Sequence, residues 1–363
     1  MSQTKKRVLI ILSTILFILL YIVFAFRFSG DELQLNPKWT ISATRATTVE
    51  NSEVESFPFK LGQNLGYFTE SGEVTFSESF PYMATISKNN WSIFSSSAEN
   101  FPIYNKEQSE VGTVVAAGFP FYTDYGNFLF LPGGMSFAYL SSTGEVLWTY
   151  EDVTPITSFY PYENGVIVGY VEGKIINFDF NGNIIFTATP GGSNYSVILG
   201  VASSNDGALS ACVSGIDNQR FVLMKTSNGQ TKIIFHEFLS GNLREQTFVK
   251  FSKDNSKVFY NEKNGLGAVD ITTLKSSHIS IEGKILAIEE MPDDNLFFVL
   301  TKADGVYRVY IIEDLDNLVG SYVFKGNSAF IFVDKNNLYT GVDSTITKIE
   351  VQRWKWQIKN FLH

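Results

Sequence analysis

Residues 141–152, "SSTGEVLWTYED", contain a polar turn followed by a short strand that ends in an aromatic side chain. Glycine at position 144 supplies the positive φ that a tight hairpin turn requires. The residues after it alternate in character and reach Trp148, as expected for a half-buried strand. This stretch therefore predicts one arm of a β-hairpin, and similar stretches recur along the chain.

The recurring stretches share a small or polar residue, a glycine and a strand that closes on an aromatic residue. They are "ESGEVTF" ending at Phe76, "FNGNIIF" ending at Phe186 and "SNGQTKIIF" ending at Phe235. Weaker equivalents occur near Gln108, Thr273 and Asn317. Successive copies are about 36 to 47 residues apart, which is close to the repeat length of propeller blades.

A second turn signature lies about twenty residues away from the first and has the same period of about forty. It places a cluster of Asp, Asn and Gly before an apolar strand, because Asn and Asp tolerate the left-handed backbone of hairpin tips. Its turn positions are Asn164, Asp206, Asn255, Asp294 and Asn336. Two turn signatures in one period predict a four-stranded unit made of two hairpins. The sequence therefore predicts an all-β fold, a single β-propeller.

The blade around the opening stretch can be assigned strand by strand as "FPFYT", "NFLFLP", "GMSFAYLS" and "EVLWTYE". Trp148 falls on its outermost strand, where its ring is expected to pack between neighbouring blades. Residues 38–352 have room for about eight four-stranded blades. The last blade lacks an evident fourth strand, and "KWTISA" near Trp39 is expected to supply it and so close the ring. Seven blades are the alternative, because the first inner strand, "TTVENSEV", is weakly apolar.

The motifs "TGEVLW" and "NGNIIF" resemble the outer-strand motif of PQQ-like repeat propellers, the group that includes BamB-like scaffolds and quinoprotein alcohol dehydrogenases. Other stretches, such as "FSKDNSKVFY", look more like blades of the TolB or WD40 type. The resemblance covers about residues 38–352 and implies a propeller fold and a protein-binding role. Quinone enzymes of this group use adjacent cysteines, and this chain has only Cys212, so the resemblance carries over no cofactor.

The N-terminal segment predicts a membrane anchor. Residues 8–26 form an uncharged run that would cover roughly 28 Å as a helix, close to the thickness of a bilayer core. Residues 1–7 form a basic cytoplasmic tail, and residues 27–37 form a tether. The positive charge before the run places the remainder across the membrane, on the periplasmic or extracytoplasmic side of a bacterial inner membrane. An unconventional cleaved signal peptide is the alternative.

Composition limits the class of partner and the environment. The net charge is −9, and the first 27 residues carry four cationic side chains and no acidic one, so the remainder is more acidic still. Such a body repels phosphate backbones, which argues against nucleic-acid binding. The single cysteine, Cys212, excludes an intramolecular disulfide and is expected to be a buried, inert thiol.

No recognisable catalytic or metal-binding motif is present in the sequence. The three histidines, His236, His278 and His363, show no H-x-x-x-H spacing, and there is no C-x-x-C pair. We therefore predict no metal site and no cofactor, and His236 and His278 are expected to face solvent or to pack between blades. The glycines of "GLGAVD" at Gly265 do not complete a dinucleotide fingerprint and are assigned to a strand.

Two aromatic loops, "FPFYTDYGN" and "FYPYENG", are candidates for contact with a partner, since Tyr and Phe are enriched at interfaces. Their candidate contact residues are Tyr122, Tyr125, Tyr160 and Tyr162. Packing between blades is the alternative for all four.

The basic aromatic tail, residues 353–363, adds Trp354 and Trp356 as candidate partner contacts. Tryptophan together with lysine suits a membrane interface or a partner surface. A last outer strand or a packed cap is the alternative for this tail.

The leading functional hypothesis is a membrane-anchored propeller that acts as a protein-binding scaffold or assembly factor for another envelope protein. The absence of a recognisable catalytic set favours binding over enzyme activity. The alternative is a sensor, hydrolase or lyase that binds a small ligand or glycan in the central channel, because channel residues come from different blades and have no local motif.

Overall fold

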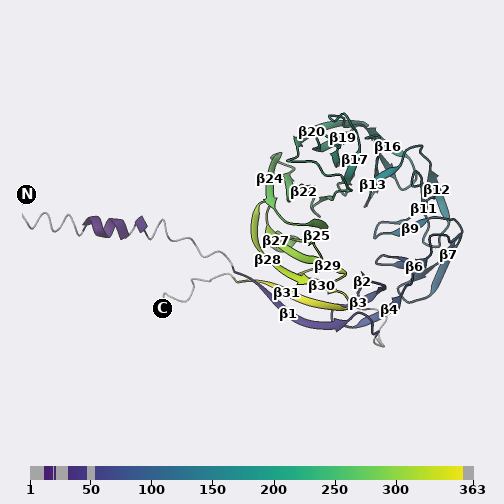
Figure 1. Ribbon diagram of the computed structural model, residues 1–363, viewed down its shortest axis with the longest axis horizontal. Coiled ribbons are helices and arrows are strands. Elements are labelled where there is room, and N and C mark those ends of the chain that lie inside the picture. Colours follow the sequence, from purple (N-terminus) through teal and green to yellow (C-terminus); the bar gives the residue numbers. More distant parts are fainter. Residues whose placement is uncertain (1–11, 19, 22–31, 47–53, 355–363) are drawn as a thin grey trace, which may run out of the picture. The chain divides into compact units, whose positions relative to one another are not determined.

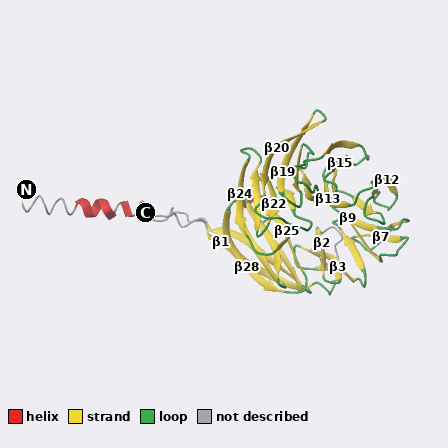
Figure 2. Ribbon diagram, turned by 45° about the horizontal axis from the view of Figure 1, so that its top comes forward, coloured by secondary structure: helices red, strands yellow, loops and turns green. Residues whose placement is uncertain are grey.

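The computed structural model of the protein describes residues 12–18, 20–21, 32–46 and 54–354. Its chain falls into two units, residues 1–36 with 350–363 and residues 37–349. The second unit contains a ring of sheets (Figure 1). The tilted view in Figure 2 shows that strands make up most of this unit and that short loops join them at the ends of the blades.

Eight antiparallel sheets are present in the described residues, and we number them as blades in chain order. Each blade has its innermost strand first, and the inner strands β13, β17 and β21 contact one another in sequence. The prediction of about eight blades is confirmed. The seven-blade alternative is wrong, because a regular strand, β2, supplies the inner strand of blade 1, and the residues "TTVENSE" lie outside the described part of the chain.

The strands of the first four blades follow one another without crossovers. Blade 1 contains β2 (Ser56–Leu61), β3 (Asn64–Thr69) and β4 (Val74–Ser79). Blade 2 contains β5 (Met83–Ile86), β6 (Asn90–Phe94), β7 (Phe101–Asn105) and β8 (Glu110–Val114). Blade 3 contains β9 (Phe119–Tyr122), β10 (Asn127–Phe130), β11 (Phe137–Leu140) and β12 (Val146–Tyr150). Blade 4 contains β13 (Ile156–Tyr162), β14 (Gly165–Tyr170), β15 (Ile175–Asp179) and β16 (Ile184–Ala188).

The next blades repeat this order, and the last one adds the N-terminal strand. Blade 5 contains β17 (Ile198–Ser203), β18 (Leu209–Ser214), β19 (Arg220–Ser227) and β20 (Gln230–Phe238). Blade 6 contains β21 (Val249–Phe251), β22 (Lys257–Glu262), β23 (Gly265–Asp270) and β24 (Lys275–Ser280). Blade 7 contains β25 (Lys284–Met291), the 3₁₀ turn Pro292–Asp294, β26 (Leu296–Ala303), β27 (Val306–Glu313) and β28 (Asn317–Lys325). Blade 8 contains β29 (Ala329–Asp334), β30 (Asn337–Val342), β31 (Thr345–Trp354) and β1 (Glu32–Ser42).

The ring closes as the sequence predicts, because β1 pairs with β31 at the outer edge of blade 8 in the order β1-β31-β30-β29. This pairing covers the outer edge of β31 and leaves β1 as the outermost strand of the blade. The boundaries differ from those expected. Strand β1 begins at Glu32, so residues 32–37 of the predicted tether are strand, and β31 continues through Arg353 to Trp354.

The turn glycines have the geometry that the repeat predicts, with φ of 93° at Gly72, 92° at Gly144 and 84° at Gly182. In the weaker repeats the left-handed residue is Gln108, Leu274 or Asp314. The left-handed residue lies one position after the expected Thr273 in one of these turns and three positions before the expected Asn317 in another.

Trp148 lies on the outermost strand of blade 3 and packs against blade 4, as predicted. Its indole N–H donates to the carbonyl of Phe180 at 2.9 Å, and its ring stacks on Phe178 with centroids 6.0 Å apart. A Cβ on Gly182 would lie only 3.0 Å from this ring. The turn glycine therefore has a second role, since it leaves space for the tryptophan of the preceding blade.

Trp39 makes the same contact where the ring closes. Its indole N–H donates to the carbonyl of Glu70 at 3.2 Å, and its ring lies 3.0 Å from where a Cβ on Gly72 would stand. The aromatic residue of an outer strand thus covers the turn glycine of the next blade at two seams of the ring. This recurring contact explains the motif by packing alone.

Residues 12–18 and 20–21 are helical, and they lie inside the predicted anchor, residues 8–26. Within the described residues, no helix has both the length and the apolar character needed to cross a bilayer. The other residues of the predicted anchor lie outside the described part of the chain.

Candidate functional site

Three of the four tyrosines chosen as candidate partner contacts are packed between blades. Tyr122 is 4% exposed and its hydroxyl lies 2.9 Å from Ser92 Oγ, whereas Tyr162 is 1% exposed and donates to Asn177 Oδ1 at 3.0 Å. Tyr160 packs against two core clusters, one shared by blades 4 and 5 and one shared by blades 5 and 6, and burial raises the pKa of its hydroxyl. Their assignment to an exposed surface is corrected accordingly, because their rings fill the seams.

Tyr125 is the one tyrosine of this set with substantial exposure, at 44% of its surface. It borders a polar hollow of ≈ 200 Å³ between the loops of blades 2 and 3. The lining includes Asn89, Asp124 and Ser142, so this hollow offers hydrogen-bonding groups and little apolar surface.

The C-terminal candidates are described only in part. The backbone of Trp354 belongs to β31, which agrees with the strand alternative for the start of the tail. The side chain of Trp354 and all of Trp356 lie outside the described residues.

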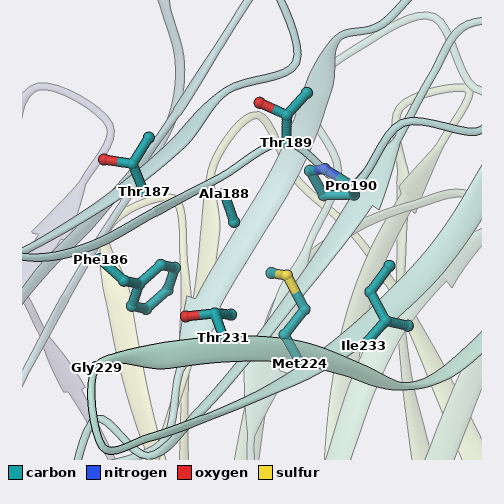
Figure 3. Close-up of a pocket in the computed structure, with 9 residues that line it drawn as sticks. All are labelled: Phe186, Thr187, Ala188, Thr189, Pro190, Met224, Gly229, Thr231 and Ile233. Atoms are coloured by element: carbon teal, nitrogen blue, oxygen red, sulfur yellow. The ribbon is translucent and has the colours of Figure 1, made fainter.

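A groove of ≈ 350 Å³ lies on the outer rim between blades 4 and 5 (Figure 3). The segment from Phe186 to Pro190 forms one side, and Met224, Thr231 and Ile233 form the other. Its lining contains no charged side chain, so it offers a contact surface of small and apolar groups.

A larger hollow of ≈ 390 Å³ lies between blades 1 and 2, and we call it the β4 groove. Trp91 lines it, and its ring is tilted against Phe76 at 4.8 Å and stacked on Tyr104 at 4.5 Å between centroids. Its full lining is Phe76, Glu78, Trp91, Ile93, Pro102, Tyr104 and Gln108. The groove is thus an aromatic surface with polar groups at its edge, which is the usual anatomy of a protein-binding pocket.

The position of the β4 groove follows from the strand count. Blade 1 has three strands in the described chain, whereas the other seven blades have four. No described strand pairs with the outer edge of β4.

A polar cluster that the sequence analysis missed lies between blades 5 and 6. His278 Nδ1 is 2.8 Å from Glu262 Oε1, and His278 Nε2 is 3.7 Å from Glu237 Oε2. Burial raises the pKa of the Glu237 carboxyl. Glu237, Glu262 and His278 are the one group of three metal-ligating side chains in the described part of the chain. They lie on β20, β22 and β24, and the register of these strands brings them together.

Cys212 is fully buried, and desolvation raises the pKa of its thiol to about 12. The thiol is therefore protonated at neutral pH and unreactive, as the sequence predicts.

Comparison with known proteins agrees with this architecture. The family described as "beta-propeller protein" matches residues 1–355, so the chain belongs to this β-propeller family. An uncharacterized protein of Treponema pallidum (strain Nichols) is 27% identical over 308 residues, which cover 85% of this chain and 82% of that protein. The crystal structure of BamB from Moraxella catarrhalis has 14% sequence identity and a TM-score of 0.60, covering 87% of this chain and 100% of BamB. The PQQ-like, BamB-like propeller fold expected from the repeat is thereby confirmed.

Proposed function

We propose that the protein is a membrane-anchored, extracytoplasmic propeller that binds an extended segment of another envelope protein. The β4 groove is the observation that carries this proposal, because it is an aromatic hollow with polar groups at its edge. The resemblance to PQQ-like scaffold propellers and the basic, apolar N-terminus support the envelope location.

Binding at this site would place an extended partner segment in the groove beside β4. Such a segment directs every second side chain to one face, so alternate side chains would enter the groove. An aromatic or apolar side chain fits the hollow, because Phe76, Tyr104 and Trp91 line it. Glu78 and Gln108 stand exposed at its edge, where they would contact the polar part of the same segment.

A photo-crosslinking amino acid at Gln108 should capture this partner in native membranes. The matched control is Leu318, which is exposed on the outer strand of blade 7, far along the chain from the groove. We expect one specific adduct at position 108 and none at 318. The Glu78→Arg variant should weaken the adduct at least about tenfold without lowering the unfolding temperature, since Glu78 is exposed. Equal adducts at both positions, or none, would remove the groove from the proposal.

The anchor has its own test. The full chain should stay in the membrane fraction during alkaline extraction, because an apolar run of this length partitions into the bilayer. A variant that lacks residues 1–27 should be released. Release of the full chain under the same conditions would contradict the anchor and leave the groove untouched.

A further inference from the structure

The pairing of the strands shows which residues of blades 5 and 6 face each other across the seam. Phe221 of β19 stacks on Tyr260 of β22, with ring centroids 4.0 Å apart and planes 15° apart. Phe221 pairs with Glu237 across β19 and β20. Since directly paired residues of neighbouring strands project to the same face, Glu237 lies on the face of blade 5 that meets blade 6.

The facing residues of blade 6 follow from the same rule. Tyr260 pairs with Gly267, and Gly267 pairs with His278. Glu262 is two residues from Tyr260 on the same strand, so it shares that face. The face of blade 6 that meets blade 5 therefore carries both Glu262 and His278, and Glu237 comes to them from across the seam.

A glycine of β23 leaves space beside this cluster. A Cβ on Gly267 would lie 2.2 Å from the Tyr260 ring, whereas one on Gly265 would be in ordinary contact with Glu262 Oε2, at 3.6 Å. The Tyr260 side chain thus lies over Gly267, whose partner on β24 is His278. This gives a reason for glycine at position 267 of "GLGAVD".

Two buried oxygens at this place have no hydrogen-bond partner in the described chain, Glu237 Oε1 and Tyr260 Oη. Tyr260 is completely buried, and its hydroxyl stands over Gly267, whose direct partner on β24 is His278. Buried polar atoms are nearly always paired, so each of these two oxygens can take a further hydrogen bond or ligand.

The charges point to a cation. Within the described residues, His278 is the one ion-pair partner of both Glu237 and Glu262. The charge of one histidine does not balance the charges of two carboxylates whose side chains are only 19% and 9% exposed. A divalent ion would compensate both charges at once.

We propose that Glu237, Glu262 and His278 bind one divalent transition-metal ion of the Zn²⁺ type at the seam between blades 5 and 6. One ligand atom from each residue lies within 4.8 Å of the others, which suits a single ion with small rearrangement of the side chains. Imidazole and carboxylate are ligands that Zn²⁺ accepts, and three protein ligands leave a position for water. Because the ligands come from two blades, the ion ties these blades together.

The test is titration of ZnCl₂ into the full chain after removal of metal with EDTA, followed by calorimetry. We expect one Zn²⁺ per chain and a rise in unfolding temperature, since a ligand that binds only the folded state stabilises it. The His278→Gln and Glu237→Gln variants should each weaken Zn²⁺ binding by at least about 10- to 100-fold. Loss of a residue that only orients a metal ligand already lowers the metal affinity by this factor. Co²⁺ should give a ligand-field absorption band in the wild type that both variants lose.

His236→Gln is the matched control, since His236 is an exposed neighbour of Glu237 on the same strand. It should bind Zn²⁺ as tightly as the wild type. Absence of stoichiometric binding to the wild type would overturn the proposal, as would equal loss in the His236→Gln variant. Should the His278→Gln variant fail to fold, the wild-type titration and the near-isosteric Glu237→Gln variant still decide the question.

Discussion

Trp148→Ala is expected to lower the free energy of unfolding by about 3 kcal/mol, at the lower end of the range for tryptophan truncation in a core. The ring is partly exposed, but it contacts Phe137 at 5.5 Å and Phe178 at 6.0 Å between centroids. Its removal would leave a hollow over Gly182, which has no side chain to fill it. Urea-induced unfolding followed by circular dichroism measures the change.

Leu147→Ala provides the control on the same strand, because Leu147 points to the opposite face and is 55% exposed. It should change the free energy of unfolding by less than about 0.5 kcal/mol. Trp148→Phe separates the two contributions of the indole, since it keeps an aromatic ring and removes the hydrogen bond to the Phe180 carbonyl. We expect Phe to retain much of the stability and to lose about 1 kcal/mol for the bond. Equal effects of Trp148→Ala and Leu147→Ala would contradict the role of the tryptophan at the seam.

The repeat was sufficient to predict the fold because its two signals act at short range. A left-handed turn residue and an alternating strand are decided within about ten residues, so Gly144 and Trp148 reveal their hairpin without the rest of the protein. Ring closure was also predictable, since "KWTISA" has the character of an outer strand and the last blade lacks one. The extension of β1 back to Glu32 was not, because its mostly polar residues show no apolar face.

The candidate contacts were harder to predict because both faces of these strands are apolar. In "FPFY" of β9, Phe119 and Phe121 are exposed, whereas Pro120 and Tyr122 are buried. Alternation identifies a strand, but it does not say which face meets the neighbouring blade when all residues are apolar or aromatic. The sequence analysis therefore placed Tyr122 on the wrong face.

The cluster at the seam of blades 5 and 6 has no local signature. Glu237, Glu262 and His278 lie on three strands of two blades, and their proximity depends on the register of each hairpin. The β4 groove depends on a strand count for blade 1, which the sequence repeat does not give, because "ESGEVTF" looks like a complete outer hairpin. Both sites thus follow from tertiary arrangement.

Gly112→Ala should destabilise the ring by about 2–3 kcal/mol, although it adds a single methyl group. Gly112 on β8 stands four residues after the left-handed turn residue Gln108, as Trp148 stands four residues after Gly144. It thus occupies the position that carries an aromatic residue in other repeats. No ring fits at this position between the outer strand of blade 2 and the turn of blade 3, since a Cβ on Gly112 would lie 1.9 Å from the carbonyl oxygen of Thr143.

The clash is with backbone, so no side-chain rotation relieves it. Gly144 of the same turn also approaches β8, since its own Cβ would lie 2.9 Å from the carbonyl carbon of Thr113. The added methyl group must therefore push the turn of blade 3 away from the outer strand of blade 2. Hydrogen exchange should become faster in the amides of β8 and in residues 141–144, whereas that of blades 5 to 7 should be unchanged.

Gly320→Ala is the matched control, because this glycine also lies on an outer strand but has no atom within 4 Å of its added Cβ. It should be neutral or slightly stabilising, since alanine loses less conformational freedom on folding. A Gly112→Ala variant as stable as Gly320→Ala would mean that blades 2 and 3 do not meet backbone to backbone. Together with the Trp148 series, the pair of glycine variants separates two ways of joining blades, an aromatic ring over glycine and direct backbone contact.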